Sequence, residues 1–127
     1  MTQNRYRSGL ERQVAAQLDR LGIPYEYETD RVEYVRPAKP SRYTPDFPVT
    51  TASGKRMYIE TKGRFDIDDR AKHRLIREQH PELDIRFVFS NSKNKISKTS
   101  KTTYADWCER YGFLFSDKRI PQEWLDE

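Results

Sequence analysis

The sequence is poor in the residues that build disulfides and zinc sites: it has one cysteine, Cys108, and two histidines. A single cysteine cannot form an intrachain disulfide, and it fits a reducing compartment. Two histidines without a C-x-x-C or H-E-x-x-H pattern exclude the common zinc centres. No apolar run is long enough to span a bilayer, and no signal-peptide pattern or internal repeat is visible. We therefore expect no membrane partner.

Hydrophobic residues are also scarce. They make up 35% of the 127 residues, charged residues make up another 35%, and the mean hydropathy is −1.04. This length forms one domain with a small core, which favours a core shared between two chains. Lys and Arg outnumber Asp and Glu by 24 to 20, and the net charge of +4 favours a polyanionic partner. Residues 85–105 contain no acidic residue and carry Arg86, Lys93, Lys95, Lys98 and Lys101.

Two short segments carry the residues that indicate chemistry. Asp46 belongs to a Pro-Asp pair and Glu60 to a Glu-x-Lys pattern, and each lies on a predicted strand. Side chains alternate between the two faces of a strand, so Glu60 and Lys62 share one face. The turn-forming residues 52–55 would fold the second strand beside the first and bring Asp46 next to Glu60.

These residue types suit the hydrolysis of a phosphodiester. Mg²⁺ prefers oxygen ligands, and Asp46 and Glu60 supply carboxylates. A bound Mg²⁺ would activate a water molecule and offset the charge that develops on the phosphate, and we expect Mn²⁺ to substitute for it. Lys62 would orient the attacking water or stabilise the phosphate charge.

The same residues have a plainer interpretation. Glu-x-Lys on a strand is a frequent surface salt bridge, worth about 0–1 kcal/mol, and the pattern alone favours it over catalysis. Pro45 shifts the balance toward a site, because a residue without an N–H places Asp46 at the margin of an edge strand. Glu11 also has two interpretations. With Ser8 it fits a capping box, which the residues favour, yet it also lies at the edge of an apolar helix stripe where a carboxylate can face a cleft.

The overall pattern predicts an α/β chain in which helices cover a mixed sheet. Gly22, Pro81 and Gly112 predict the ends of its helices. In chain order we expect a helix at 8–20, strands at 25–29 and 32–35, a stiff connector at 36–41, the two strands that carry Asp46 and Glu60, a helix at 66–80, a strand at 85–89, a Lys-rich loop at 90–102, a helix at 103–111 and a terminal turn around Trp124.

Longer motifs extend beyond these pairs. They are Arg7–Glu11, Tyr43–Phe47, Glu60–Gly63, Asp68–Arg70 with Lys72–His73, Leu75–Arg86 and Ile120–Trp124. In order and spacing this series resembles the phage endonuclease I family, from about Arg7 to Trp124. The resemblance implies a Holliday junction resolvase of the PD-(D/E)xK superfamily, with a restriction-endonuclease-like core.

The resemblance also implies the site and the assembly. The family's catalytic residues fall on Glu11, Asp46, Glu60 and Lys62, and its metal ligands on Glu11, Asp46, Glu60 and the carbonyl of Thr61. The family forms an intertwined, domain-swapped homodimer, so residues 32–41 would bridge two lobes and each site would take Glu11 from one chain and the other residues from its partner. It further implies action in the cytoplasm of an infected bacterial host.

Basic residues outside the site are expected to contact DNA phosphates. They are Arg5, Arg7, Arg70, Lys72, His73, Arg74, Lys93, Lys95 and Lys98. A solvated helix face is the alternative for those within 66–80. Asp66, Asp68 and Asp69 suggest a second metal site, but the helix dipole favours acids in a first helical turn and is the better explanation.

We therefore expect a Mg²⁺-dependent endonuclease that makes paired nicks in four-way junctions and other branched DNA and leaves 5′-phosphate ends. One alternative is a restriction-like nuclease that cuts linear duplex DNA. The other is a non-catalytic basic DNA-binding domain whose carboxylates only bridge lysines.

Overall fold

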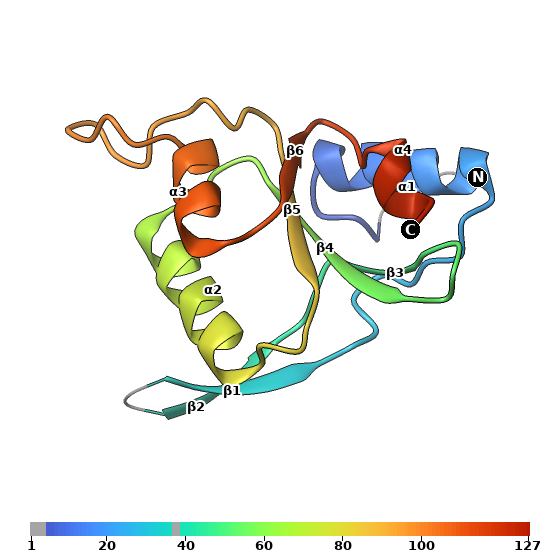
Figure 1. The fold of residues 1–127 in the computed structure, drawn as a ribbon, viewed down its shortest axis with the longest axis horizontal. Coiled ribbons are helices and arrows are strands. Elements are labelled where there is room, and N and C mark those ends of the chain that lie inside the picture. The colour runs from blue at the N-terminus through green and yellow to red at the C-terminus, as the bar shows by residue number, and fades with distance from the viewer. Residues whose placement is uncertain (1–4, 37–38) are drawn as a thin grey trace.

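The computed structural model describes residues 5–36 and 39–127 (Figure 1). The helices are α1 (Gly9–Leu21), α2 (Ile67–Gln79), α3 (Tyr104–Tyr111) and α4 (Gln122–Leu125). The strands are β1 (Val32–Arg36), β2 (Lys39–Tyr43), β3 (Phe47–Thr50), β4 (Arg56–Lys62), β5 (Ile85–Phe89) and β6 (Phe115–Asp117). The predicted α/β class is confirmed.

The main sheet has four strands in the order β3-β4-β5-β6. β3 runs antiparallel to β4, whereas β4, β5 and β6 run parallel to one another, so the sheet is mixed as predicted. Gly54, with a φ of 89°, supplies the left-handed residue in the turn that returns β4 beside β3. β3 is an edge strand, and it tolerates Pro48 because a missing N–H costs little at an edge.

Helices cover both faces of the main sheet (Figure 1). α1 and α4 pack on one face against Met57 and Ile59 of β4. α2 and α3 pack on the other, which receives Tyr58 and Glu60. The alternation of β4 therefore divides its side chains between an apolar core and a face that holds polar groups.

The predicted helix ends are confirmed. Gly22 and Gly112 adopt left-handed φ values of 67° and 77° at the ends of α1 and α3, and α2 ends before Pro81. Trp107 and Trp124 are buried in the two cores. Within the described ranges, no helix combines the length and the apolar character that crossing a membrane requires.

The stiff connector predicted at 36–41 is wrong at Arg36 and over Lys39–Ser41. Arg36 is the last residue of β1, and Lys39–Ser41 lie in β2, which pairs with β1 as a separate antiparallel hairpin. Pro40 fits there because each strand of a two-stranded ribbon keeps one unpaired edge. The rest of the predicted connector, 37–38, lies outside the described residues.

Two other expectations are corrected. The strand predicted at 25–29 does not form, since Tyr25 makes an isolated bridge with Val49 and Glu28 has a φ of 53°, which interrupts an extended backbone. The C-terminal segment holds more regular structure than the predicted turn, because β6 extends the main sheet and α4 packs Trp124 against α1.

Candidate active site

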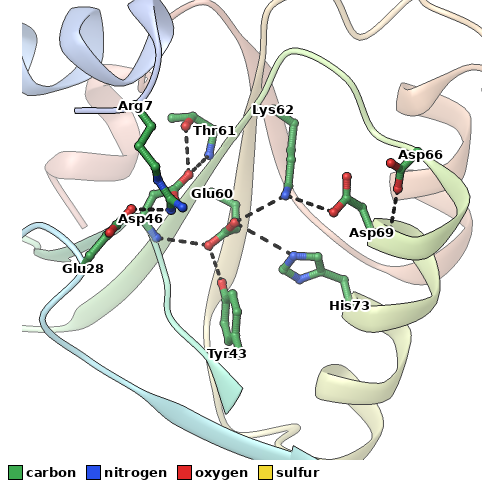
Figure 2. Close-up of polar contacts among 10 residues, drawn as sticks. All are labelled: Arg7, Glu28, Tyr43, Asp46, Glu60, Thr61, Lys62, Asp66, Asp69 and His73. Carbon is green, nitrogen blue, oxygen red and sulfur yellow. Dashed lines mark hydrogen bonds and ion pairs between the residues drawn. The ribbon is translucent and has the colours of Figure 1, made fainter. Parts of the chain in front are cut away.

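Asp46 lies directly before β3, where the chain enters the main sheet. The register pairs Phe47 with Ile59, which places Asp46 beside Glu60 and Thr61. The Asp46 backbone N–H donates to Glu60 Oε2 at 3.1 Å. Asp46 Oδ2 accepts hydrogen bonds from the backbone N–H and the hydroxyl of Thr61, at 3.0 and 2.8 Å. The predicted approach of Asp46 to Glu60 is confirmed (Figure 2).

Glu60 is the most enclosed acid of the site, with 4% of its surface exposed. Its Oε2 also accepts a hydrogen bond from the Tyr43 hydroxyl at 2.7 Å. Its Oε1 faces Lys62 Nζ at 3.8 Å and His73 Nε2 at 4.0 Å. Burial, followed by the negative charge of Asp46, raises the pKa of Glu60 to about 8. The carboxyl group therefore favours its neutral form at pH 7 unless a cation joins the site.

Lys62 projects from the same face of β4 as Glu60, as predicted. Its Nζ also lies 3.4 Å from Asp69 Oδ1 on α2. Asp66 caps α2 by accepting a hydrogen bond from the Asp69 N–H at 2.9 Å, and Asp68 is exposed. In residues 5–36 and 39–127 these three acids form no group with metal-ligand spacing. Their arrangement agrees with the explanation that the sequence favoured, in which acids in the first helical turn interact with the helix dipole and do not form a second metal site.

Glu11 lies in the first turn of α1. Its N–H donates to Ser8 Oγ at 3.0 Å, as a capping box requires, but its carboxylate accepts from the Arg7 N–H at 2.6 Å instead of from Ser8. It also accepts a hydrogen bond from the Tyr27 hydroxyl at 2.7 Å. The predicted capping box is therefore only half formed.

Glu11, Glu28 and Asp46 form a carboxylate group in which one oxygen of each residue lies within 4.8 Å of the others. Sequence reasoning missed Glu28. Its N–H donates to the Asp46 carbonyl at 3.1 Å, and its side chain pairs with Arg7. No local pattern distinguishes a glutamate in an irregular loop, so only the fold reveals this neighbour.

The donor set fits a hard divalent cation such as Mg²⁺, which takes oxygen ligands. Burial and, to a smaller degree, the charge of Glu11 raise the pKa of Asp46, although hydrogen bonds from Thr61 oppose this. Burial is the first cause of the raised pKa at both Asp46 and Glu60, and the charge of a neighbouring acid adds to it, so a bound cation would favour the ionised form of both groups. Glu11, Glu28 and Asp46 are the carboxylates whose spacing suits a bound cation. Glu60 as a ligand stays a prediction. The Thr61 carbonyl stays a prediction.

The whole chain, residues 1–127, matches the family model described as Phage endonuclease I. The chain belongs to the phage endonuclease I family. It is 52% identical over 122 residues to "Endonuclease I" of Escherichia phage T7, a match that covers 96% of this chain and 79% of that protein. It is 54% identical over 121 residues to "Endodeoxyribonuclease 1" of Enterobacteria phage T3, covering 94% and 77%. The resemblance inferred from the motifs is confirmed.

In this phage endonuclease I family member, two of the residues predicted to contact DNA are buried, so those two predictions are wrong. His73 is fully buried, and Arg70 is 9% exposed. The Arg70 guanidinium donates to the carbonyl oxygens of Phe65 and Ile96, at 2.6 and 3.3 Å, so it ties the Lys-rich loop to the start of α2. The other predicted contacts are exposed or partly exposed and stay predictions: Arg5, Arg7, Lys72, Arg74, Lys93, Lys95 and Lys98.

The raised pKa of Glu60 predicts how the stability of the metal-free protein depends on pH. The folded pKa of about 8 lies above the ordinary value of 4.5, so the stabilising contribution is complete below the lower value and is lost as the pH rises through the higher one. Burial lowers the pKa of His73, and below about pH 6.5 this has the opposite effect, because stability there rises with pH. Stability should therefore fall between about pH 7 and 8.5, by up to ~1.4 kcal/mol per pH unit.

Thermal unfolding in EDTA across this pH range measures the effect. Glu60→Gln cannot titrate and is the matched control, so its stability should lack the decline. A wild-type stability that stays level from pH 7 to 8.5, or that changes in parallel with Glu60→Gln, would contradict the raised pKa.

Proposed function

We propose that this protein is a Mg²⁺-dependent, structure-selective endodeoxyribonuclease that resolves four-way junctions and other branched DNA by paired nicks that leave 5′-phosphate ends. The observation that carries the proposal is the adjacency of Asp46 and Glu60, with Lys62 beside them, in a chain that matches its family throughout. The names of the T7 and T3 relatives support DNA as the substrate. The resemblance carried by the sequence motifs supports junctions as the preferred form.

The chemistry follows from the side chains of the site. Asp46, Glu60 and Glu11 would hold Mg²⁺, or Mn²⁺ in its place; when bound, the cation lowers the pKa of a ligated water and offsets charge on the phosphate. Lys62 Nζ, which lies near Glu60 and Asp69, would orient the attacking water or neutralise the phosphate. Burial strengthens these interactions, because electrostatic attraction is larger away from water.

A domain-swapped homodimer is part of the proposal. The segment 5–36 contains α1 and β1 and is linked to the rest of the chain at 37–38. It docks on the remaining fold through contacts that include two hydrogen bonds between the Gln17 side chain and the Ile120 backbone, at 2.8 and 3.0 Å. If the β1–β2 hairpin opens into an extended ribbon, the segment can dock on a second chain through the same contacts.

Such an exchange would make residues 32–41 the bridge between two lobes. Each active site would combine Glu11 of one chain with Asp46, Glu60 and Lys62 of its partner. A closed two-fold dimer carries two equivalent sites, which suits a junction cut by paired nicks.

A comparison of two substrates tests the proposed function. A four-way junction and a linear duplex of the same sequence are each incubated with and without Mg²⁺. We expect cleavage of the junction alone, and only with Mg²⁺. Equal cleavage of the linear duplex would indicate a restriction-like nuclease. Binding of both substrates without any cleavage would indicate a DNA-binding domain whose carboxylates only bridge lysines.

Replacing Glu11 with glutamine separates capping from catalysis. The amide oxygen can still accept from the Arg7 N–H and the Tyr27 hydroxyl, so the free energy of unfolding should change by well under the ~1 kcal/mol of a lost cap. Junction cleavage should collapse, because the site loses an anionic ligand. Ser8→Ala is the reciprocal control and should lose stability but keep activity. A lower melting temperature of Glu11→Gln with unchanged cleavage would reduce Glu11 to a cap.

The exposed lysines of the loop 90–102 predict the salt dependence of junction binding. They are Lys93, Lys95 and Lys98. Replacing one of them with glutamine should weaken binding to all branched substrates alike and reduce the slope of log K against log salt by about one unit. Lys55→Gln is the control, because Lys55 pairs with Asp84 and Glu127 at the opposite end of β4. An unchanged slope in the loop variants would show that these lysines are solvated and do not contact the DNA phosphates.

A further inference from the structure

His73 lies in the middle of α2 and is fully buried, yet neither ring nitrogen has a hydrogen-bond partner among the residues that the structure describes. Aromatic rings enclose it, with the centroids of Tyr43 and Phe87 at 5.2 and 4.9 Å in edge-on contacts. A buried polar group without a partner is uncommon, because nothing replaces its lost hydration. A phenylalanine would fill the same space without that penalty. Packing alone therefore does not explain why a histidine occupies this position.

The position of Glu60 supplies that reason. His73 Nε2 lies 4.0 Å from Glu60 Oε1, about 1 Å beyond the length of a hydrogen bond. Glu60 Oε2 already accepts from the Tyr43 hydroxyl and the Asp46 N–H. Oε1 is therefore the oxygen left to accept a further hydrogen bond. Figure 2 shows Lys62 and His73 directed at this carboxylate from different elements, β4 and α2.

His73 is a neutral donor in this place. The ring is fully buried among aromatic side chains, where a positive charge would be costly. A neutral imidazole has one N–H and one lone pair, so a proton on Nε2 makes a donor that faces Glu60 without adding charge.

We propose that His73 is a positioning residue of the active site, whose Nε2–H donates a hydrogen bond to Glu60 Oε1 when Glu60 acts as a metal-binding carboxylate. This inference rests on the proposed function, in which Glu60 binds a divalent cation. The bond from His73 on one oxygen and the bond from Tyr43 on the other would hold the carboxylate in one orientation. Losing such an outer partner of a metal ligand typically lowers metal affinity by about 10- to 100-fold.

Three variants separate positioning from packing. His73→Gln keeps an N–H near the place of Nε2, and His73→Phe keeps a ring without a donor. Phe113→Leu loosens the same core, 6.4 Å from the His73 ring centroid, without removing a partner of Glu60. The affinity of the DNA-free protein for Mn²⁺, measured by calorimetry, is compared with the melting temperature for each variant.

We expect His73→Phe to weaken Mn²⁺ binding by about 10- to 100-fold at a near wild-type melting temperature, and His73→Gln to stay within about 3-fold of wild type. Phe113→Leu should melt earlier and bind Mn²⁺ normally. If His73→Phe does not fold, His73→Leu replaces it with the same expectation.

Wild-type Mn²⁺ affinity in His73→Phe would overturn the proposal. Equal losses in His73→Gln and His73→Phe that follow their melting temperatures would also overturn it and leave a packing role. These outcomes differ from a failure of the proposed function, in which the wild-type protein itself neither binds Mn²⁺ nor cleaves a junction.

Discussion

Replacing Asp46 or Glu60 with alanine is expected to reduce junction cleavage by at least ~1,000-fold and to leave junction binding unchanged or tighter. Each substitution removes a carboxylate that would hold Mg²⁺, and a loss of about 4 kcal/mol of metal-assisted stabilisation corresponds to that factor. Removing an anion also lowers the repulsion of the DNA phosphates. Single-turnover cleavage and equilibrium binding of one labelled junction measure the two effects separately.

The control for these substitutions is Glu109→Ala, because Glu109 is an exposed acid on α3. It should cleave and bind at wild-type levels. Near wild-type cleavage by the Asp46 or Glu60 variant would refute the site assignment. Melting temperatures show whether a variant that loses both binding and cleavage has simply unfolded.

A mixed dimer of one Glu11→Ala chain and one Glu60→Ala chain is expected to nick one strand of a junction. If the swap shares sites between chains, one site carries both lesions and the other carries neither. If each chain builds its own site, both sites carry one lesion and the mixed dimer is inactive on both strands. The two homodimeric variants are the controls, and both should be inactive.

The closed hairpin brings Glu11 and Asp46 together within one chain. A swap would therefore leave the composition of the site unchanged and alter only which chain supplies Glu11. The chains must be mixed by co-expression or refolding, since an intertwined dimer should exchange slowly. An inactive mixed dimer, shown by mass to be a heterodimer, would exclude the shared site and leave two self-contained nuclease domains.

Local signals in the sequence predicted most elements and the centre of the site. Gly22 and Gly112 ended their helices because left-handed residues close a helix, whatever packs around it. The approach of Asp46 to Glu60 followed from strand alternation and one short turn, both of which depend on neighbours in the sequence. The parts of the fold that depend on distant partners were harder to predict. Glu28 and the pairing of β2 belong to that group.

The buried face of α2 shows why features that depend on distant partners are hard to predict. Arg70, His73 and Ile76 recur every three residues and form this face, although only Ile76 is apolar. A sequence pattern assigns such a helix to solvent, because arginine and histidine are usually exposed. The structure buries Arg70 on backbone carbonyls and His73 beside Glu60, which turns two expected DNA contacts into internal ones.

Cleavage of a four-way junction in EDTA, followed by addition of Mg²⁺ and analysis of the product ends, tests the central claim most directly. Asp46 and Glu60 are proposed to act through a bound cation, so we expect no cleavage before Mg²⁺ is added. Afterwards we expect paired nicks whose products DNA ligase seals without prior phosphorylation, because the ends carry 5′-phosphates. Equal cleavage in EDTA, or products that ligase seals only after a 5′-phosphate is added, would contradict the account.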